Sequence, residues 1–174
     1  MLDGGVPDVE LGGITIALRM KGESIEEMTG FLAAANERLH ILRCPGERFR
    51  PVVIPSYNGA RKCANLTPLL GMLLQRFGIP VLIHGQIEGF GRVTTAQILR
   101  EFGMMPVTSQ AQAQQMLNQS ELAFVPISVI CSGLAQQLSL RGRLGLRNSA
   151  HSLVKMIDPF GGRGLILTGA THPD

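Results

Sequence analysis

The segment from Val52 to Ile83 constrains the fold more than any other part of the chain. Val52 to Ile54 is a short β-branched run flanked by prolines, an apolar helical stretch follows over residues 66–77, and Val81 to Ile83 is a second apolar run that begins after a glycine and a proline. A strand, a helix and a second strand in this order form a βαβ unit, in which the two strands pair in parallel. The sequence therefore predicts an α/β fold with a parallel sheet and flanking helices.

The same alternation continues towards the C-terminus. Further helices are predicted over residues 94–102, 109–118, 128–140 and 149–157, and further strands over residues 122–125 and 165–167. After the last of these strands, a parallel α/β domain should place another covering helix, but only residues 168–174 remain. We therefore expect the α/β domain to be incomplete and the chain to be truncated.

Two helices precede this domain. Asp8 is a possible cap for the first, which Gly22 ends, and Ser24 with Glu27 forms a capping box for a second helix that extends to Leu39. Two helices cannot bury their apolar stripes alone, so they must pack on the following domain or on another copy of the chain. We predict part of a helical domain over residues 1–42, a linker over 43–50 and an incomplete α/β domain over 51–174.

Composition narrows the class of protein. Hydrophobic residues make up 45% of the 174 residues and charged residues 17%, which is enough apolar material for a core, and charged or polar residues interrupt every apolar stretch. The three cysteines, Cys44, Cys63 and Cys131, are widely spaced and read as reduced thiols. We expect a cytoplasmic protein with no membrane association and no metal site.

The charges are distributed unevenly along the chain. Residues 1–47 hold eight acids and four bases, whereas residues 48–174 hold five acids and twelve bases, all arginine except Lys62 and Lys155. Arginine presents a planar set of donors that suits phosphate oxygens. This pattern favours a polyanion or an anionic ligand as the partner, and a merely solvated basic surface is the alternative.

The first candidate site is the loop after the first strand, which contains Asn58, Gly59, Arg61 and Lys62. Ligands of open α/β sheets bind outside the carboxyl ends of the strands, where backbone N–H groups and a helix N-terminus attract anions. Two adjacent bases without a nearby acid strengthen that interpretation. The alternative is an ordinary connection with an Asn-Gly turn.

The second candidate follows the next strand. His84 and Gly85 end that strand, and Arg92 precedes Thr94 and Thr95 at a helix start, an arrangement that suits a phosphate group. Histidine at this position is also a conceivable general acid. However, no carboxylate is placed by the sequence to orient it, and a lone histidine is more often structural.

The third candidate is a basic loop followed by a helix start. Its residues are Arg141, Arg143, Arg147, Asn148, Ser149 and Lys155. A helix N-terminus supplemented by arginine is an anion site on electrostatic grounds, and a solvated basic loop is the alternative.

Residues 48–174 are poor in the acids that catalysis and metal binding use. The five are scattered and form no DxD or adjacent pair that would hold Mg²⁺ on a phosphate: Glu88, Glu101, Glu121, Asp158 and Asp174. We assign no catalytic residue.

Three strings carry a family resemblance that covers nearly the whole chain. They are ALRMKGE at 17–23, IPSYNGARK at 54–62 and RNSAHSLVK at 147–155. Together they resemble the anthranilate phosphoribosyltransferase superfamily, with the glycosyltransferase family 3 fold, and more closely its YbiB-type nucleic-acid-binding branch. The resemblance implies an N-terminal helical domain that mediates a homodimer.

The chain departs from the catalytic members of that superfamily. Their GTGGD loop corresponds to residues 56–60, where two glycines and the aspartate are replaced, and their KHGN corresponds to residues 83–86, where the lysine is lost. Arg141 falls where those enzymes hold the anthranilate carboxylate, and their acidic Mg²⁺-binding pair lies beyond residue 174. The resemblance therefore implies the fold and an affinity for anions, but not the catalysis.

Three functions remain open. The leading hypothesis is non-catalytic, largely sequence-independent binding of DNA or RNA, without a cofactor, through Arg61, Lys62, Arg92, Arg141, Arg143, Arg147 and Lys155. The alternative is a phosphoribosyltransferase that uses phosphoribosyl pyrophosphate and Mg²⁺ on an unidentified acceptor, with the phosphate groups held by Asn58, Gly59, His84, Gly85, Thr94, Thr95, Asn148 and Ser149. The third is a scaffold or regulatory dimer that retains only the fold.

Overall fold

The four strands form one parallel sheet, as the sequence predicts. The computed structural model describes residues 1–46, 48–59, 64–89, 91–119 and 121–169. The sheet has the order β3-β2-β1-β4, with every neighbouring pair parallel. Its strands are β1 (Val52–Ser56), β2 (Val81–Gly85), β3 (Ala123–Pro126) and β4 (Leu165–Ile166). The chain adds β2 and β3 on one side of β1 and then returns to place β4 on its other side, so the strand order reverses at β1, where open α/β sheets bind ligands.

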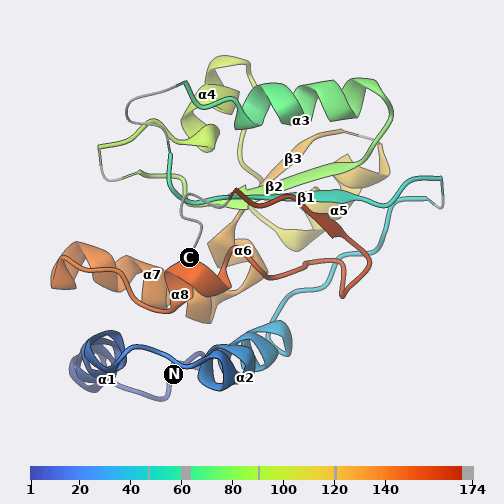
Figure 1. The fold of residues 1–174 in the computed structure, drawn as a ribbon. Coiled ribbons are helices and arrows are strands. Elements are labelled where there is room, and N and C mark those ends of the chain that lie inside the picture. Colours follow the sequence, from blue (N-terminus) through green and yellow to red (C-terminus); the bar gives the residue numbers. More distant parts are fainter. Residues whose placement is uncertain (47, 60–63, 90, 120, 170–174) are drawn as a thin grey trace.

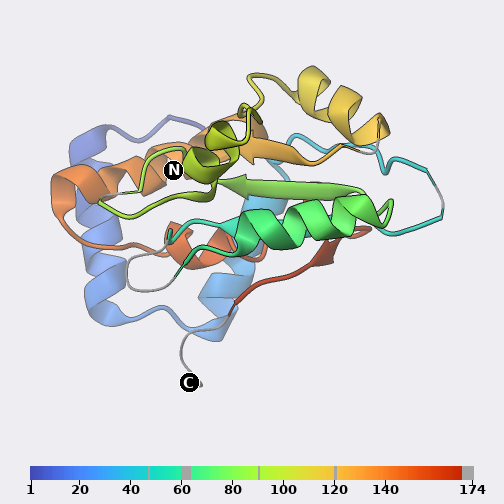
Figure 2. The same ribbon diagram turned by 90° about the horizontal axis from the view of Figure 1, so that it is seen from above.

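Helices cover both faces of the sheet (Figure 1). On one face lie α3 (Thr67–Arg76) and α4 (Thr95–Glu101). On the other face lie α5 (Gln110–Asn118), α6 (Ile127–Ile130), α7 (Ser132–Leu144) and α8 (Ala150–Leu153). Figure 2 shows the same arrangement from above, with α3 running along the central strands.

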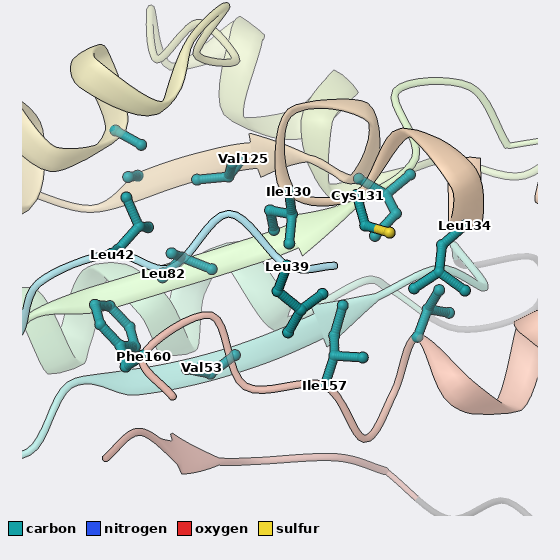
Figure 3. Close-up of a cluster of buried hydrophobic side chains, with 14 of the residues drawn as sticks. Leu39, Leu42, Val53, Leu82, Val125, Ile130, Cys131, Leu134, Ile157 and Phe160 are labelled. Atoms are coloured by element: carbon teal, nitrogen blue, oxygen red, sulfur yellow. The ribbon is translucent and has the colours of Figure 1, made fainter. Parts of the chain in front are cut away.

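The strand residues alternate between two cores. Ile54 and Ile83 belong to the cluster beneath α3 and α4, whereas Val53, Leu82 and Val125 belong to the larger cluster on the opposite face. Figure 3 shows this larger cluster, in which side chains from the strands meet those of the covering helices. The strands are apolar along their length because a parallel sheet is buried on both faces.

The N-terminal helices are α1 (Asp8–Lys21) and α2 (Ile25–Asn36), which lie below α7 and α8 in Figure 1. The capping box is confirmed: the Glu27 backbone N–H donates to Ser24 Oγ at 3.2 Å, and the Ser24 N–H donates to the Glu27 carboxylate at 2.9 Å. Asp8 does not cap α1, because it is the first helical residue and Pro7 occupies the cap position.

The second helix is shorter than predicted. It ends at Asn36, and the backbone N–H groups of Arg38 and Leu39 donate to the carbonyls three residues back, which tightens the chain into a turn. The next N–H, that of His40, donates to the Ile130 carbonyl of α6 at 2.9 Å. Leu39 was expected within the helix; it lies beyond it because the chain leaves the helix to pair with α6.

The helical segment packs on the following domain. Ala35, Leu39 and Leu42 are buried in the same cluster as the sheet residues, and two of them are labelled in Figure 3. This leaves other apolar side chains on the outer surface, because Val9, Met20 and Ile25 are each more than 80% exposed. Packing on the following domain therefore accounts for only part of the apolar surface of these helices.

Glutamines of α5 hold the start of the predicted linker. The Gln114 side chain accepts from the Arg43 N–H at 2.7 Å and donates to the Arg43 carbonyl at 3.1 Å, and the Gln110 amide donates to the Ile41 carbonyl at 2.8 Å. These bonds give the glutamine-rich helix a structural purpose: it pairs with a segment that has no regular secondary structure of its own.

Two C-terminal helices differ from prediction. Residues 128–140 were expected as one helix, but α6 ends at Ile130, and α7 runs from Ser132 to Leu144, where Gly145 ends it in the left-handed conformation at φ 71°. The helix expected over 149–157 is only the four-residue α8, followed by turns.

No helix built by the described residues has the length and apolar character needed to cross a bilayer. Cys44 and Cys131 are free thiols, and Cys63 lies outside the described residues.

Candidate functional site

Asn58 is the point at which the three predicted sites meet. It follows β1, its backbone carbonyl accepts from Arg92 Nη1 at 3.1 Å, and its side-chain oxygen accepts from Arg147 Nη2. Arg92 belongs to the loop after β2, and Arg147 follows α7. The carboxyl ends of β1 and β2 therefore bring together one residue from each of the three segments that the sequence singled out.

Two further arginines act on Arg147 through their charges, and we call Arg19, Arg92, Arg141 and Arg147 the arginine cluster. Partial burial lowers the pKa of Arg147, and the positive charges of Arg141, Arg92 and Arg19 lower it further. These charge effects indicate that the three arginines share the electrostatic surroundings of Arg147. Arg19 comes from α1, so the cluster contains residues of both the helical segment and the α/β domain.

Three of the four arginines have no acidic partner among the described residues. Within the described ranges, no carboxylate lies within ion-pair distance of Arg19, Arg92 or Arg147. Three neighbouring arginines, Arg19, Arg92 and Arg147, that lack acidic partners within the described ranges raise the local potential and attract an anion. The geometry thus indicates an anion-binding surface at the carboxyl end of the sheet.

Two predicted glycines have close backbone neighbours. Gly59 has φ 54°, and a Cβ atom at this position would lie 2.9 Å from the Val93 carbonyl oxygen. A Cβ atom on Gly85 would lie 2.1 Å from the Ser56 carbonyl oxygen. Both positions need glycine because neighbouring backbone approaches closely, and Gly59 needs it also for its left-handed conformation.

The two predicted threonines are buried and bonded within the protein. Thr94 caps α4 together with Gln97, and its hydroxyl also donates to the Ile87 carbonyl at 2.9 Å. The Thr95 hydroxyl lies 2.7 Å from Ser56 Oγ and accepts from the Asn65 amide at 3.0 Å. Their side chains hold the loops after β1 and β2 in place.

His84 is fully buried and paired with Tyr57. Its Nδ1 lies 2.6 Å from the Tyr57 hydroxyl oxygen, and the two rings meet edge to face. Burial lowers the pKa of His84 from 6.5 to about 3 and raises the pKa of Tyr57 well above 10. The imidazole is therefore neutral near pH 7, a state that suits the structural role left open for it rather than that of a general acid.

The cap predicted at the start of the last helix is wrong. Ser149 has helical backbone angles and makes no side-chain cap; its hydroxyl donates to the Glu23 carboxylate, and the buried Asn148 amide donates to the Gln137 carbonyl at 2.8 Å. One turn of helix has no appreciable macrodipole. These two residues instead connect the chain after α7 to the α1–α2 connection and to α7 itself.

The basic loop is largely helical. Arg141 and Arg143 lie in the last turn of α7, and Arg143 pairs with Asp8 of α1 at 2.5 Å. Lys155 lies in the turns after α8, and its charge, after those of Arg147 and Arg141, helps to lower the pKa of His151 to about 4, for which burial is the main cause. Arg61 and Lys62 lie outside the described residues.

A pocket of about 600 Å³ opens beside the cluster. Arg92, Glu88 and Gln97 contribute to its walls.

No group of three or more metal-ligating side chains is found in the parts of the chain that the structure describes.

Sequence reasoning missed several residues of the site. The sequence analysis assigned no role to Arg19, Tyr57 or Asn65. Their contacts depend on segments distant in sequence, so no local pattern signals them.

Comparison with known proteins agrees with this architecture. Residues 1–38 match the family model described as "Glycosyl transferase family, helical bundle domain". Anthranilate phosphoribosyltransferase (TrpD) from Thermus thermophilus superposes with a TM-score of 0.72 at 21% identity, covering 94% of this chain and 48% of that one. The superposition shows that the chain shares the fold of this transferase, and the family model shows that its first 38 residues are similar to the helical bundle domain of that glycosyltransferase family, in agreement with the sequence resemblance.

Two sequence relatives refine the placement. The anthranilate phosphoribosyltransferase of Caldanaerobacter subterraneus subsp. tengcongensis is 25% identical over 177 residues, covering 99% of this chain and 52% of the relative. Uncharacterized protein YbiB of Escherichia coli is 47% identical over 175 residues, covering all of this chain and 55% of the relative. The chain is thus more similar to YbiB than to this transferase, and it spans about half the length of the curated relatives it matches.

Proposed function

We propose that this chain binds nucleic acid through the arginine cluster, largely independently of base sequence and without catalysing a reaction. The observation that carries the proposal is that Asn58 holds Arg92 and Arg147 from separate segments, with the charges of Arg19 and Arg141 also acting on Arg147. We propose that the nucleic-acid-binding surface also includes four further basic residues: Arg61, Lys62, Arg143 and Lys155. Arginine forks suit phosphate oxygens, which every nucleic acid presents at regular intervals.

Contacts with the nucleic-acid backbone account for such binding better than contacts with the bases. The sequence contains one tyrosine and no tryptophan. That tyrosine, Tyr57, directs its hydroxyl to the buried His84. Few aromatic side chains remain for stacking on bases, so affinity comes mainly from phosphate contacts, which carry no sequence information.

The same loops argue against catalysis. His84 is buried and neutral, the Asn58 side chain is bonded to Arg147, and the Ser56 and Thr95 hydroxyls are bonded to each other. A phosphoribosyl pyrophosphate site would have to draw on these groups. In the proposed function they instead fix the loops that present the arginines.

A transferase is the second candidate, because the chain is 25% identical to a named anthranilate phosphoribosyltransferase along nearly its whole length. In that case phosphoribosyl pyrophosphate would lie over Asn58, Gly59, Gly85 and Thr94, with Mg²⁺ as its counterion. A Mg²⁺-dependent rise in melting temperature with phosphoribosyl pyrophosphate would support this alternative.

We also propose a homodimer through the N-terminal helices. Val9, Met20 and Ile25 of α1 and α2 are 81%, 82% and 82% exposed, and large apolar side chains grouped on two neighbouring helices favour burial against another copy. Multi-angle light scattering tests this: a dimer mass that Met20→Glu halves supports it, and a monomer in the parent chain rejects it.

Free thiols favour a reducing compartment, so we place the protein in the cytoplasm.

The direct test compares unrelated nucleic acids. Fluorescence anisotropy of labelled oligonucleotides, two unrelated sequences each as single strand and duplex, should give dissociation constants within about tenfold of one another at fixed salt. Strong preference for one sequence would contradict backbone binding. Binding of neither oligonucleotides nor phosphoribosyl pyrophosphate would leave a scaffold as the better account.

A further inference from the structure

A second pocket, of about 250 Å³, lies between the N-terminal helices and the layer of α7 and α8. Its apolar walls come from three elements, with Leu18 on α1, Phe31 on α2 and Leu153 on α8. Its described walls include none of the four arginines of the cluster. It is therefore a feature of the junction between the two parts of the chain and is separate from the proposed nucleic-acid surface.

Gln137 of α7 lines this pocket with an unused amide. The residue is only 7% exposed, and its backbone carbonyl accepts from Asn148. Its side-chain amide has no hydrogen-bond partner among the residues that the structure describes, although a primary amide offers two donors and one acceptor oxygen. The amide atoms are open to the pocket and are not sealed from solvent, so they can pair with a molecule that enters it.

The other polar groups of the wall are already satisfied. The Thr15 hydroxyl donates to the Gly12 carbonyl at 2.9 Å, and the Ser149 hydroxyl donates to the Glu23 carboxylate. Asp3 and Arg38, whose charged side chains line the wall, pair with each other at 2.6 and 2.9 Å. Neither side chain therefore offers an unpaired counter-charge to a ligand, which favours an uncharged molecule at this part of the wall.

We propose that this pocket binds a small, uncharged, largely apolar molecule that carries one group complementary to the Gln137 amide. Apolar cavities of about 150 Å³ hold benzene, so about 250 Å³ accommodates a ring with a short polar substituent. A carboxamide on an aromatic ring has both the size and the hydrogen-bonding pattern. The ligand contacts α1, α2, α7 and α8 together, so its binding stabilises the docking of the N-terminal helices.

Benzamide and toluene are suitable probes because they share the ring and differ in the amide. In a ¹H–¹⁵N NMR titration of the whole chain, benzamide should shift the Gln137 side-chain amide and the backbone amides of Leu18 and Phe31, and the shifts should saturate. Toluene should shift the same backbone amides more weakly. Absence of saturable shifts with both probes, or shifts that map elsewhere, would overturn the proposal.

Substitutions can test the Gln137 amide and the volume of the pocket separately. Gln137→Leu should lower the affinity for benzamide about three- to tenfold, which is the effect of one lost neutral hydrogen bond. The same variant should bind toluene at least as tightly as the parent chain does. Ala34→Leu fills the pocket and should abolish both, whereas Ala33→Leu, at the exposed neighbouring position of α2, should change neither. Equal benzamide affinity in the parent chain and the Gln137→Leu variant would reject the assigned role of the amide.

Discussion

Arg147 donates a hydrogen bond through Nη2 to the side-chain oxygen of Asn58, which ties the segment after α7 to the loop after β1. The same asparagine accepts from Arg92 through its backbone carbonyl. One residue thus fixes two guanidinium groups that repel each other. A structure that holds like charges together in this way is prepared for an anion, because the repulsion is relieved when the anion binds.

Reversing the charge of Arg147 should weaken nucleic-acid binding selectively. Arg147→Glu places a carboxylate in the centre of the cluster, so we expect affinity for a labelled oligonucleotide at low salt to fall about tenfold or more and the salt slope to flatten by about one to two. Arg76→Glu changes the net charge equally. Arg76 lies in the last turn of α3, near the opposite end of the strands (Figure 1), so its reversal should have a much smaller effect. Equal losses in both variants would mean that net charge, not the cluster, determines affinity.

Releasing Arg143 should strengthen binding. Asp8 pairs with Arg143 at 2.5 Å across the junction between α1 and α7. Asp8→Asn frees this arginine for phosphate, so affinity should rise about two- to fivefold at low salt, while an exposed ion pair of this kind costs at most about 1 kcal/mol of stability when broken. Glu10→Gln removes an equal charge from the same helix and should raise affinity less. If the two variants behave alike, the ion pair does not restrain Arg143.

Adding a methyl group at Gly59 should destabilise the loop after β1. Alanine at φ 54° is strained, and its Cβ would meet the Val93 carbonyl oxygen at 2.9 Å, so Gly59→Ala should lower the free energy of unfolding by about 1–3 kcal/mol. Gly30→Ala is the matched control: Gly30 lies within α2, and a Cβ atom there would have no neighbour within 4 Å. That variant should be more stable by up to about 1 kcal/mol. Urea unfolding followed by circular dichroism distinguishes the two, and an unchanged midpoint for Gly59→Ala would contradict the close packing.

His84 should make stability depend on pH. Burial lowers its pKa from 6.5 to about 3, so the unfolded chain binds this proton more readily than the folded one. Stability is therefore fully present above about pH 6.5 and falls as the pH is lowered towards 3, by up to about 1.4 kcal/mol per pH unit from this residue.

The His84→Gln variant tests this dependence. We expect a lower stability at pH 7, because the contact with Tyr57 is altered, but a shallower decline of unfolding free energy between about pH 6.5 and 4.5. His40→Gln, at an exposed position, should leave the decline as it is in the parent chain. A decline in His84→Gln as steep as in the parent chain would show that burial of this histidine is not its source.

Local sequence patterns predicted the elements well because their determinants are local. The capping box of Ser24 and Glu27 and the βαβ order around α3 were both readable from a few residues. The end of α2 was not, because it is set by the bond from His40 to Ile130, a contact between distant segments. The end of α7 was predicted at residue 140, but the helix continues to Leu144, and Gly145 ends it in the left-handed conformation.

The candidate site was predictable only in part. The resemblance and the βαβ order indicated the loops after β1 and β2 and the residues around Arg147, and the structure brings Asn58, Arg92 and Arg147 together. Arg19 joins them from α1 through packing that no sequence interval encodes. The predicted helix cap at Asn148 and Ser149 was wrong, because those side chains bond to Gln137 and Glu23.

The salt dependence of nucleic-acid affinity tests the central claim most directly. Anisotropy of one labelled oligonucleotide from about 50 to 300 mM salt should show the logarithm of the binding constant falling linearly with the logarithm of salt concentration, with a slope of about three or more for the four arginines of the cluster. Binding that does not change with salt, or no binding at about 50 mM, would contradict the account.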